Sequence, residues 1–288
     1  MAIDFLAKEV VAARDEKMLA AVQTLKEKGI TPCLAIVRVG ERPDDISYER
    51  SATKRMDKHG IVVKNVVMDE SISQEALEQT FKSVNDDPTV HGILLFQPLP
   101  KHLDVKPLEN MIAPEKDVDG ISPLNAAWLY QGDKRAVAPC TPAAVMAMLE
   151  HYGVDLTGKR VTIVGRSLVV GRPLAMLMLA KNATVTIAHS RTLDLAARTR
   201  EADIVVAAIG RARMITGDMI GENAIVMDVG INVDENGKLC GDVACDQAKE
   251  KAQAITPVPG GVGGVTTSIL EEHVLQGAFT INGLTWKN

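Results

Sequence analysis

The sequence predicts an α/β fold divided into two domains, and three observations lead to this prediction. Short apolar strands alternate with helix-patterned segments along nearly the whole chain, as in parallel sheets covered by helices. Residues 159–192 have the order strand, glycine-bounded loop, helix, strand, the unit that directs helix N–H groups at a pyrophosphate. Residues 101–140 are irregular and contain four prolines, as expected of a connection between lobes beside a cleft.

The first half of the chain supplies the elements of one parallel sheet. Residues 8–28 place apolar side chains at helical spacing, and Gly29 is a typical helix stop. A strand then ends at Gly40, and a polar loop at 41–45 precedes a helix that Gly60 closes. The expected helices cover residues 8–28, 47–59 and 73–84, and the expected strands cover residues 32–39, 62–68 and 91–96.

The second half repeats this alternation. Thr141 and Pro142 suit the start of a helix, because the hydroxyl can cap it and proline is tolerated in the first turn. A glycine-dense loop at 257–264 precedes the last helix, and residues 279–288 are expected to form a tail. The expected helices cover residues 143–151, 174–180 and 268–276, and the expected strands cover residues 161–164, 183–188, 202–208 and 224–229.

Composition narrows the class of protein. The 288 residues are 46% hydrophobic and 24% charged, an ordinary globular balance, and the net charge of −5 argues against a nucleic-acid partner. None of the four cysteines forms a C-x-x-C pair, so we expect reduced thiols and no metal site. No signal-like segment and no apolar run of membrane-spanning length occurs, so no membrane partner and a cytoplasmic location are expected.

The glycine-bounded loop reads G-R-S-L-V-V-G and is the first candidate site. Its nucleotide-binding residues would be Gly165, Arg166, Ser167 and Gly171, although a strand–helix crossover without a ligand has the same spacing. The next strand ends at His189-Ser190-Arg191-Thr192, and residues 183–192 contain no acid to hold a ribose 2′-hydroxyl. An arginine at this place suits a 2′-phosphate, so the cofactor predicted from Arg166, Ser190 and Arg191 is NADP rather than NAD.

Several motifs in a fixed order carry a resemblance to a known family. They are Tyr48 in DDISYERSATKR, GILLFQPLP at 92–100, PEKDVDG at 114–120, PCTP at 139–142, GRSLVVGRP at 165–173, ATVTIAHSRT at 183–192, MDVGIN at 227–232 and TPVPGGVGGVTTSIL at 256–270. With these motifs the chain resembles the FolD family of one-carbon metabolism, the methylenetetrahydrofolate dehydrogenase/cyclohydrolases that serve purine biosynthesis, over nearly its full length.

The resemblance implies a homodimer whose two domains hold tetrahydrofolate and NADP on either side of a cleft. Residues 1–122 with 272–288 would form the folate-binding catalytic domain, and residues 140–270 the Rossmann-like NADP-binding domain. Family members oxidise 5,10-methylenetetrahydrofolate to the methenyl cation, and most also hydrolyse that cation to 10-formyltetrahydrofolate.

The matching positions carry the expected site. Tyr48 would lie along the folate ring and Asp119 would fix its amide edge, and both are the candidate catalytic residues. The other expected substrate-binding residues are Gln97, Pro98, Leu99, Pro259, Gly260 and Gly261, and the other expected cofactor-binding residues are Ile209, Gly210, Ile231 and Thr266. Without the resemblance, Asp119 could instead be a loop-capping carboxylate, and Tyr48 could equally be a half-buried helix residue.

Two positions depart from the family pattern. The family lysine four residues after the tyrosine is replaced by Ala52, and Lys54 lies about 120° around the helix from Tyr48. The strand reads GILLFQPLP where the family has GILVQLPLP, so Phe96 takes the place of a glutamine. Both changes affect the hydrolytic step, which needs a group to move a proton. They predict a dehydrogenase with weak or absent cyclohydrolase activity, whose product a separate protein would hydrolyse.

Three other readings stay open. The chain could be the ordinary bifunctional enzyme, with another group, or a swung-in Lys54, in place of the missing lysine. It could be a binding protein without turnover, although Tyr48, Asp119 and the whole nucleotide loop are kept. It could also be a shikimate or amino-acid dehydrogenase, but no catalytic Lys–Asp pair of that kind is found.

Overall fold

The computed structural model describes residues 2–286 and divides the chain into two compact units. Unit 1 consists of Met1–Ala13, Leu129–Gly132 and Thr141–Thr266, and unit 2 consists of Arg14–Trp128, Asp133–Cys140 and Thr267–Asn288. The predicted division placed residues 1–122 in one domain, but the N-terminal strand pairs within the sheet of unit 1. Residues 2–13 therefore lie in unit 1.

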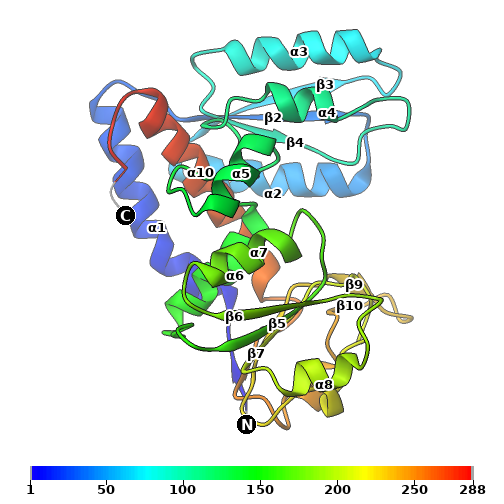
Figure 1. The fold of residues 1–288 in the computed structure, drawn as a ribbon. Coiled ribbons are helices and arrows are strands. Elements are labelled where there is room, and N and C mark those ends of the chain that lie inside the picture. The colour runs from blue at the N-terminus through cyan, green and yellow to red at the C-terminus, as the bar shows by residue number, and fades with distance from the viewer. Residues whose placement is uncertain (1, 287–288) are drawn as a thin grey trace. The chain divides into compact units, whose positions relative to one another are not determined.

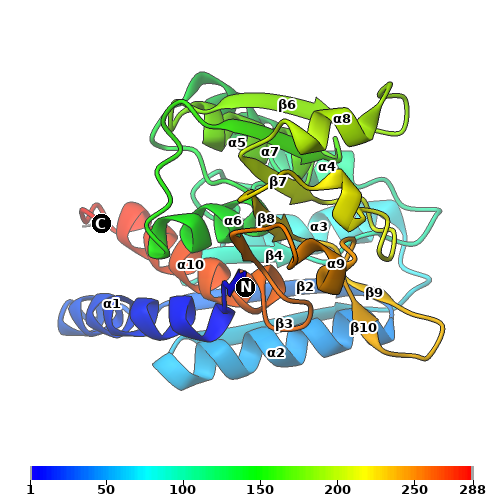
Figure 2. The same ribbon diagram turned by 90° about the horizontal axis from the view of Figure 1, so that it is seen from below.

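Unit 1 is built on a parallel sheet whose six strands, within the described part of the chain, have the order β1-β11-β8-β7-β5-β6. The strands are β1 (Ile3–Asp4), β5 (Arg160–Val164), β6 (Thr184–Ala188), β7 (Ile204–Ala207), β8 (Ile225–Asp228) and β11 (Ala254–Ile255). The helices α6 (Cys140–His151), α7 (Gly171–Leu179), α8 (Leu195–Arg200) and α9 (Cys245–Ala248) belong to this part of the chain. An antiparallel hairpin of β9 (Asn232–Val233) and β10 (Leu239–Cys240) projects from it (Figure 2).

Unit 2 is built on a parallel sheet of order β3-β2-β4, with β2 (Cys33–Val39) between β3 (Val62–Met68) and β4 (Gly92–Leu95). Its helices are α2 (Pro43–His59), α3 (Gln74–Asp86), α4 (Lys106–Met111) and most of α1 (Ala7–Glu27), α5 (Pro123–Gln131) and α10 (Thr266–Ile281). Helices α3 and α4 cover one face of the sheet, and α2 and α10 cover the other (Figure 1). The α/β prediction with two domains is confirmed.

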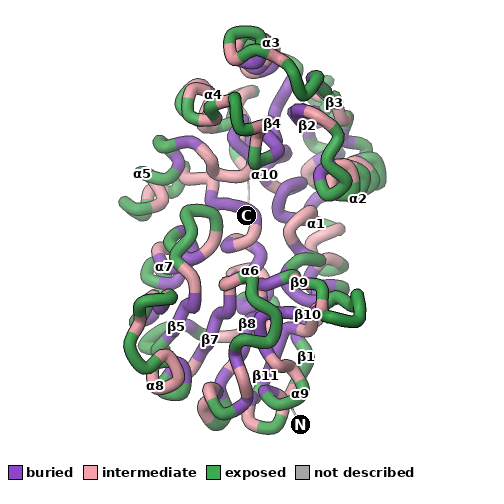
Figure 3. Tube along the Cα trace, turned by 90° about the vertical axis from the view of Figure 1, so that its right-hand side faces the viewer, coloured by how far each residue is buried: buried purple, intermediate pink, exposed green. Residues whose placement is uncertain are grey.

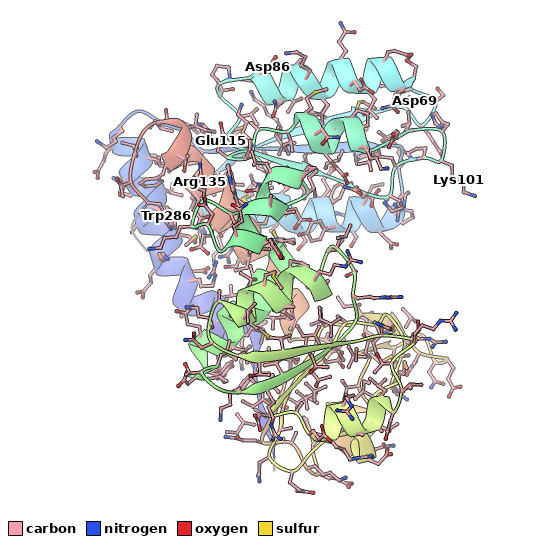
Figure 4. All side chains as sticks on the ribbon, viewed as in Figure 1. Asp69, Asp86, Lys101, Glu115, Arg135 and Trp286 are labelled. Carbon is pink, nitrogen blue, oxygen red and sulfur yellow. The ribbon has the colours of Figure 1, made fainter. Side chains whose placement is uncertain are left out.

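The central strand β2 is buried on both faces, as its unbroken apolar run predicts. Ala35 and Val37 pack in the cluster that α3 and α4 close, so the alternate residues Ile36 and Arg38 face α2. Figure 3 shows the buried strands of both units between outward-facing helices. The carboxyl ends of β3 and β4 lie at the same edge of the parallel sheet, on either side of β2. Figure 4 labels Asp69, directly after β3, and Lys101, in the loop that follows β4.

Three predicted segments differ from the structure. Helix α2 begins at Pro43 rather than residue 47, because proline is well placed at the first helical position. The irregular stretch 101–140 contains α4 and α5, whose prolines also lie in first turns. Helix α10 continues to Ile281, into the expected tail, because its last turns are buried. Residues 287 and 288 of that tail lie outside the described residues.

A buried charge cluster ties α1, α2 and α10 together within unit 2. Glu271 is fully buried, and its carboxylate accepts a hydrogen bond from Arg55 at 2.5 Å and contacts the His59 ring. Arg55 also pairs with Asp15 at 2.6 Å. Because charged groups in this interior balance one another, the cluster fixes the far end of α2.

No helix among residues 2–286 combines the length and the apolar character that crossing a membrane requires.

Candidate functional site

Tyr48 and Phe96 form an aromatic contact at the carboxyl edge of the sheet in unit 2. Tyr48 lies in α2, and Phe96 directly follows β4. Their ring centroids are 5.7 Å apart with an interplanar angle of 77°, an edge-to-face arrangement. Phe96 is buried and Tyr48 is half-buried, so the phenol ring can present a face to a planar ligand.

The chain turns directly after Phe96, where the Gln97–Pro98 peptide bond is cis. The Pro98 carbonyl accepts a hydrogen bond from Arg42 Nη1 at 3.1 Å, which links the turn to the start of α2. Gln97 and Pro98 are exposed and Leu99 is half-buried. These three predicted substrate residues therefore lie together beside the aromatic pair.

A buried ion pair holds α2 against β2 next to Tyr48. Arg38 Nε lies 2.7 Å from Glu49 Oε2, and the two side chains are only 10% and 15% exposed. The β2–β4 register aligns Val37 with Leu95, so Arg38 and Phe96 come next to each other across the strands. Sequence reasoning missed this pair, although a charged residue inside the apolar run CLAIVRV was a usable signal.

Ala52, at the position of the family lysine, and Lys54, the nearest lysine in this chain, lie on different sides of α2, as the helical spacing predicts. Ala52 lies one turn after Tyr48 and is fully buried against the sheet. Lys54 is exposed and lines a surface groove with Arg50 and Asp57, on another side of α2. Ala52 carries no ammonium group, and Lys54 belongs to the lining of that groove.

Asp119 ends a loop that its neighbour Asp117 holds in place. Asp117 is buried and accepts hydrogen bonds from the N–H groups of Ile121 and Ser122 at 3.0 and 2.8 Å. Asp119 is partly exposed, and its Oδ1 accepts the Cys140 N–H at 2.9 Å. Desolvation raises the pKa of Asp119, and the Cys140 N–H opposes this rise. One carboxylate oxygen is thus committed to the backbone while the group keeps access to solvent.

Cys140 and His273 form a buried pair behind Asp119. The His273 ring contacts the Val118 carbonyl through Nδ1 at 2.7 Å, and the Cys140 thiol points at the same carbonyl at 3.3 Å. Burial raises the pKa of the Cys140 thiol well above its ordinary value and lowers the pKa of His273. Both groups are therefore neutral supports rather than a nucleophile and its base.

The phosphate-loop residues lie together in unit 1, between β5 and α7. Gly165 has φ of +138°, and a Cβ at Gly171 would lie 2.1 Å from the Gly165 carbonyl oxygen. The loop is closed by the Val170 N–H, which donates to Ser167 Oγ at 3.0 Å. Arg166 and Ser167 are exposed. This backbone can approach a phosphate closely, and only glycine fits at both ends.

The end of β6 adds the second group of predicted cofactor residues. The His189 N–H donates to Thr192 Oγ1 at 2.8 Å, and His189 Nδ1 accepts the Arg191 N–H at 3.1 Å. These bonds fold the chain into a turn that leaves Ser190 and Arg191 exposed. A cation and a hydroxyl are therefore exposed side by side at the end of β6, and such groups suit a phosphate ligand.

Asp242 organises the end of β7 and was missed in the sequence. Its buried carboxylate accepts the N–H groups of Ile209, Gly210 and Arg211 at 2.6, 3.0 and 2.8 Å, and the Asn232 amide at 2.9 Å. Of the predicted residues Ile209 and Gly210, only the carbonyl groups are left for a ligand. The sequence offered no local signal, because donors and acceptor are about 30 residues apart.

The remaining predicted residues also lie in unit 1. Pro259, Gly260 and Gly261 are in the glycine-dense loop, Thr266 begins α10, and Ile231 follows β8. The Val258–Pro259 peptide bond is cis, Gly260 has φ of +103°, and a Cβ at Gly261 would lie 2.5 Å from the Pro257 carbonyl oxygen. The Thr266 hydroxyl donates to the Gly263 carbonyl at 3.0 Å. Ile231, at the end of the β8 segment, is 62% exposed. The predicted substrate residues are therefore divided between the two units.

The burial of Asp228 predicts that the stability of the protein depends on pH. It is 3% exposed, and burial raises its pKa from 3.8 to about 7, against the hydrogen bonds from the N–H groups of Val243 and Asp242. Below pH 3.8 both folded and unfolded states are protonated; between 3.8 and about 7 the folded state binds more protons. The free energy of unfolding should therefore fall by about 1.4 kcal/mol per pH unit across that window from this group alone.

Denaturant titrations of the wild type and of Asp228→Asn between pH 5 and 8 test this dependence. The difference between the two unfolding free energies should shift in favour of the variant as pH rises and should level off above about pH 7. A difference that does not change with pH would show that Asp228 is ionised throughout.

Comparison with known proteins gives a consistent result for both units. The model of the tetrahydrofolate dehydrogenase/cyclohydrolase catalytic domain matches residues 5–119, and that of the NAD(P)-binding domain of the same enzymes matches residues 139–281. The bifunctional protein FolD of Clostridioides difficile is 51% identical over 269 residues, which cover 93% of this chain and 94% of the relative.

Solved structures agree with this match. The bifunctional FolD of Campylobacter jejuni is 39% identical with a TM-score of 0.95, covering 97% of this chain and 99% of that one. The FolD of Trypanosoma brucei, complexed with NADP cofactor and an inhibitor, is 36% identical with a TM-score of 0.91, covering 97% of this chain and 98% of that one.

These comparisons contradict the prediction that hydrolysis is weak or absent. The relative that is half identical over nearly its whole length is bifunctional, and so is the structurally matched one. The prediction was wrong because it equated an absent side chain with absent chemistry. Ala52 and Phe96 remove a lysine and a glutamine from two positions, but a proton can be moved by a group on another turn of the same helix.

Proposed function

The chain belongs to the tetrahydrofolate dehydrogenase/cyclohydrolase family, and from this membership we propose that it is a bifunctional NADP-dependent enzyme. It oxidises 5,10-methylenetetrahydrofolate to the methenyl cation and hydrolyses that cation to 10-formyltetrahydrofolate. The observation that supports this most strongly is the 51% identity to a bifunctional relative over 93% of the chain.

The oxidation step needs orientation more than acid–base chemistry. A hydride leaves a carbon held between two nitrogens, and the resulting charge spreads over both of them. Tyr48 lies flat along the folate ring, the turn at Gln97 and Pro98 shapes the same wall, and the accessible oxygen of Asp119 holds the ring edge. Holding the carbon in one position supplies most of the rate enhancement.

The residues of unit 1 fit a dinucleotide. NADP supplies the hydride acceptor, and the cradle between Gly165 and Gly171, which a Cβ would fill, is suited to its pyrophosphate. Ser190 and Arg191 take the 2′-phosphate, since no carboxylate lies between residues 183 and 192 to repel it. Asp242 orders the end of β7, whose backbone carbonyl groups would help to hold the nicotinamide ribose.

Replacing Arg191 with alanine should weaken the use of NADP selectively. Loss of a charged hydrogen bond to the 2′-phosphate should lower kcat/KM for NADP by about 10- to 100-fold while kcat/KM for NAD stays unchanged. The measurement is initial-rate kinetics with each cofactor. Arg198→Ala, at an exposed arginine of α8, is the matched control and should leave both values unchanged. An equal loss with NAD would place Arg191 away from the 2′-phosphate.

A coupled assay tests the proposed function as a whole. Purified enzyme with methylenetetrahydrofolate and NADP should produce NADPH and then 10-formyltetrahydrofolate, with little methenyl cation accumulating. NADPH formation without the formyl product would contradict the bifunctional assignment. The proposed assembly is a homodimer in the cytoplasm, and light scattering of the purified protein measures its mass.

A further inference from the structure

Asp45 is a buried acid that the proposed mechanism does not yet use. It lies in the first turn of α2 and is 8% exposed. Within residues 2–286 its carboxylate takes part in no hydrogen bond, and its nearest cation is Arg42 Nε at 4.0 Å. The Arg42 side chain is 44% exposed, so it compensates little of the cost of burying the charge.

The position of Asp45 is next to the folate wall. Asp45 precedes Tyr48 by three residues, and residues at this spacing are neighbours on one face of a helix. Tyr48 contacts the ring of Phe96 from this face. Arg42, the cation nearest to Asp45, donates to the carbonyl of Pro98. The Asp45 carboxylate and the Tyr48 phenol are thus three residues apart on α2, and both lie next to the turn at Gln97 and Pro98.

A purely structural role does not account for this burial. The helix dipole favours acidic residues in the first turn of a helix, but this interaction does not require the acid to be buried. The neighbouring Asp44 lies in the same turn and is exposed. No side-chain hydrogen bond caps the start of α2 at Arg42. The Asp45 carboxylate accepts no hydrogen bond from the N–H groups of its own turn, and its contact with Arg42 is an ion pair at 4.0 Å. A buried carboxylate whose one ion pair is a 4.0 Å contact with a solvent-exposed arginine is typical of a group that acts on a ligand.

The other charged groups around α2 are already committed. Glu49 is paired with Arg38, Lys54 lines the outer groove, and Glu271 is closed off by Arg55 and His59. Asp45 is the acid on the Tyr48 face with the weakest pairing, a single 4.0 Å contact between its Oδ2 and Arg42 Nε.

We infer, on the basis of the proposed function, that Asp45 is the general base of the hydrolytic step and replaces the lysine missing at Ala52. The oxygen of a water molecule bonds to the methenyl carbon while one water proton passes to the Asp45 carboxylate. The bond from that carbon to N5 then breaks as Asp45 returns this proton to N5, and the hydroxyl proton leaves to solvent as the formyl carbonyl forms.

The test compares Asp45→Asn with Asp44→Asn, a matched change at the exposed neighbour. Asp45→Asn should lower kcat for methenyltetrahydrofolate hydrolysis by about 100-fold, the usual contribution of a positioned base. The KM of this substrate and kcat for oxidation should change by less than about 3-fold, since neither uses the proton transfer. The melting temperature should fall little, because the substitution keeps the size of the side chain and removes only a 4.0 Å contact with the exposed Arg42. Asp44→Asn should leave both activities unchanged, and Asp45→Glu should recover part of the hydrolysis.

Three results would overturn the assignment. Hydrolysis by Asp45→Asn within a few-fold of the wild type would show that another group moves the proton. An equal fall in both activities would mark Asp45 as a residue that positions α2. If the wild-type enzyme does not hydrolyse the cation, both the proposed function and this role of Asp45 are wrong. The wild-type hydrolysis rate distinguishes this outcome from the first two.

Discussion

Replacing Asp119 with asparagine is expected to lower kcat/KM for both oxidation and hydrolysis by about 100-fold while leaving the fold intact. The asparagine oxygen can still accept the Cys140 N–H, which Asp119 Oδ1 accepts at 2.9 Å in the wild type. The variant loses the negative charge and an acceptor for the folate ring edge. Because both reactions take place on the same bound ring, both should suffer together. Initial rates with methylene- and methenyltetrahydrofolate measure the effect.

Asp119→Ala separates the role in binding from the role in folding. It also leaves the Cys140 N–H without its acceptor, so the free energy of unfolding should drop by about 1–3 kcal/mol, in addition to the loss of activity. Asp133→Asn, at a partly exposed loop acid that pairs with Arg135, is the control for removal of an acid from unit 2. Oxidation by Asp119→Asn at the wild-type rate would show that the folate ring is held elsewhere.

A methyl group at Gly171 should abolish the use of NADP but spare hydrolysis. The added Cβ would lie 2.1 Å from the Gly165 carbonyl oxygen and 2.6 Å from its carbonyl carbon, so the phosphate loop must open. Loss of the backbone donors that surround the pyrophosphate should raise KM for NADP by about 100-fold or more. Hydrolysis of the methenyl cation needs no hydride acceptor and should keep its rate within about 3-fold of the wild type.

Gly237→Ala is the matched control for this change. Gly237 has φ of +75°, yet a Cβ there would meet no atom within 4 Å. It should cost about 1 kcal/mol through its backbone conformation and leave the KM for NADP unchanged. If Gly171→Ala slowed hydrolysis as much as oxidation, the loop would have a role beyond nucleotide binding.

The elements that the sequence predicted well are those fixed by local pattern. The apolar run from Cys33 to Val39 is a buried strand, and Gly165 and Gly171 enclose a tight loop that excludes a Cβ at either end. In these segments the side chains and the backbone conformation follow from neighbours in the chain. Strand β1 has only two residues and pairs with β11, about 250 residues away, so no local sequence pattern predicts it.

The same limit applies to the site. Tyr48 and Asp119 were predicted as site residues because they lie in motifs that resemble those of a known family. Asp242 was not, since its acceptor role appears only when the end of β7 folds back on it. Asp45 reads as an ordinary first-turn acid in the sequence DDIS, and only its burial distinguishes it from Asp44. Burial of a single carboxylate depends on packing between segments, which the sequence alone does not specify.

The most direct measurement is the decay of the methenyl cation with the wild-type enzyme in the absence of NADP. If the chain is bifunctional, the cation should disappear at a rate proportional to enzyme concentration and at least about 100-fold above buffer at catalytic enzyme levels. The product should be 10-formyltetrahydrofolate. Decay at the buffer rate, with oxidation intact, would contradict the account and leave a dehydrogenase without hydrolytic activity.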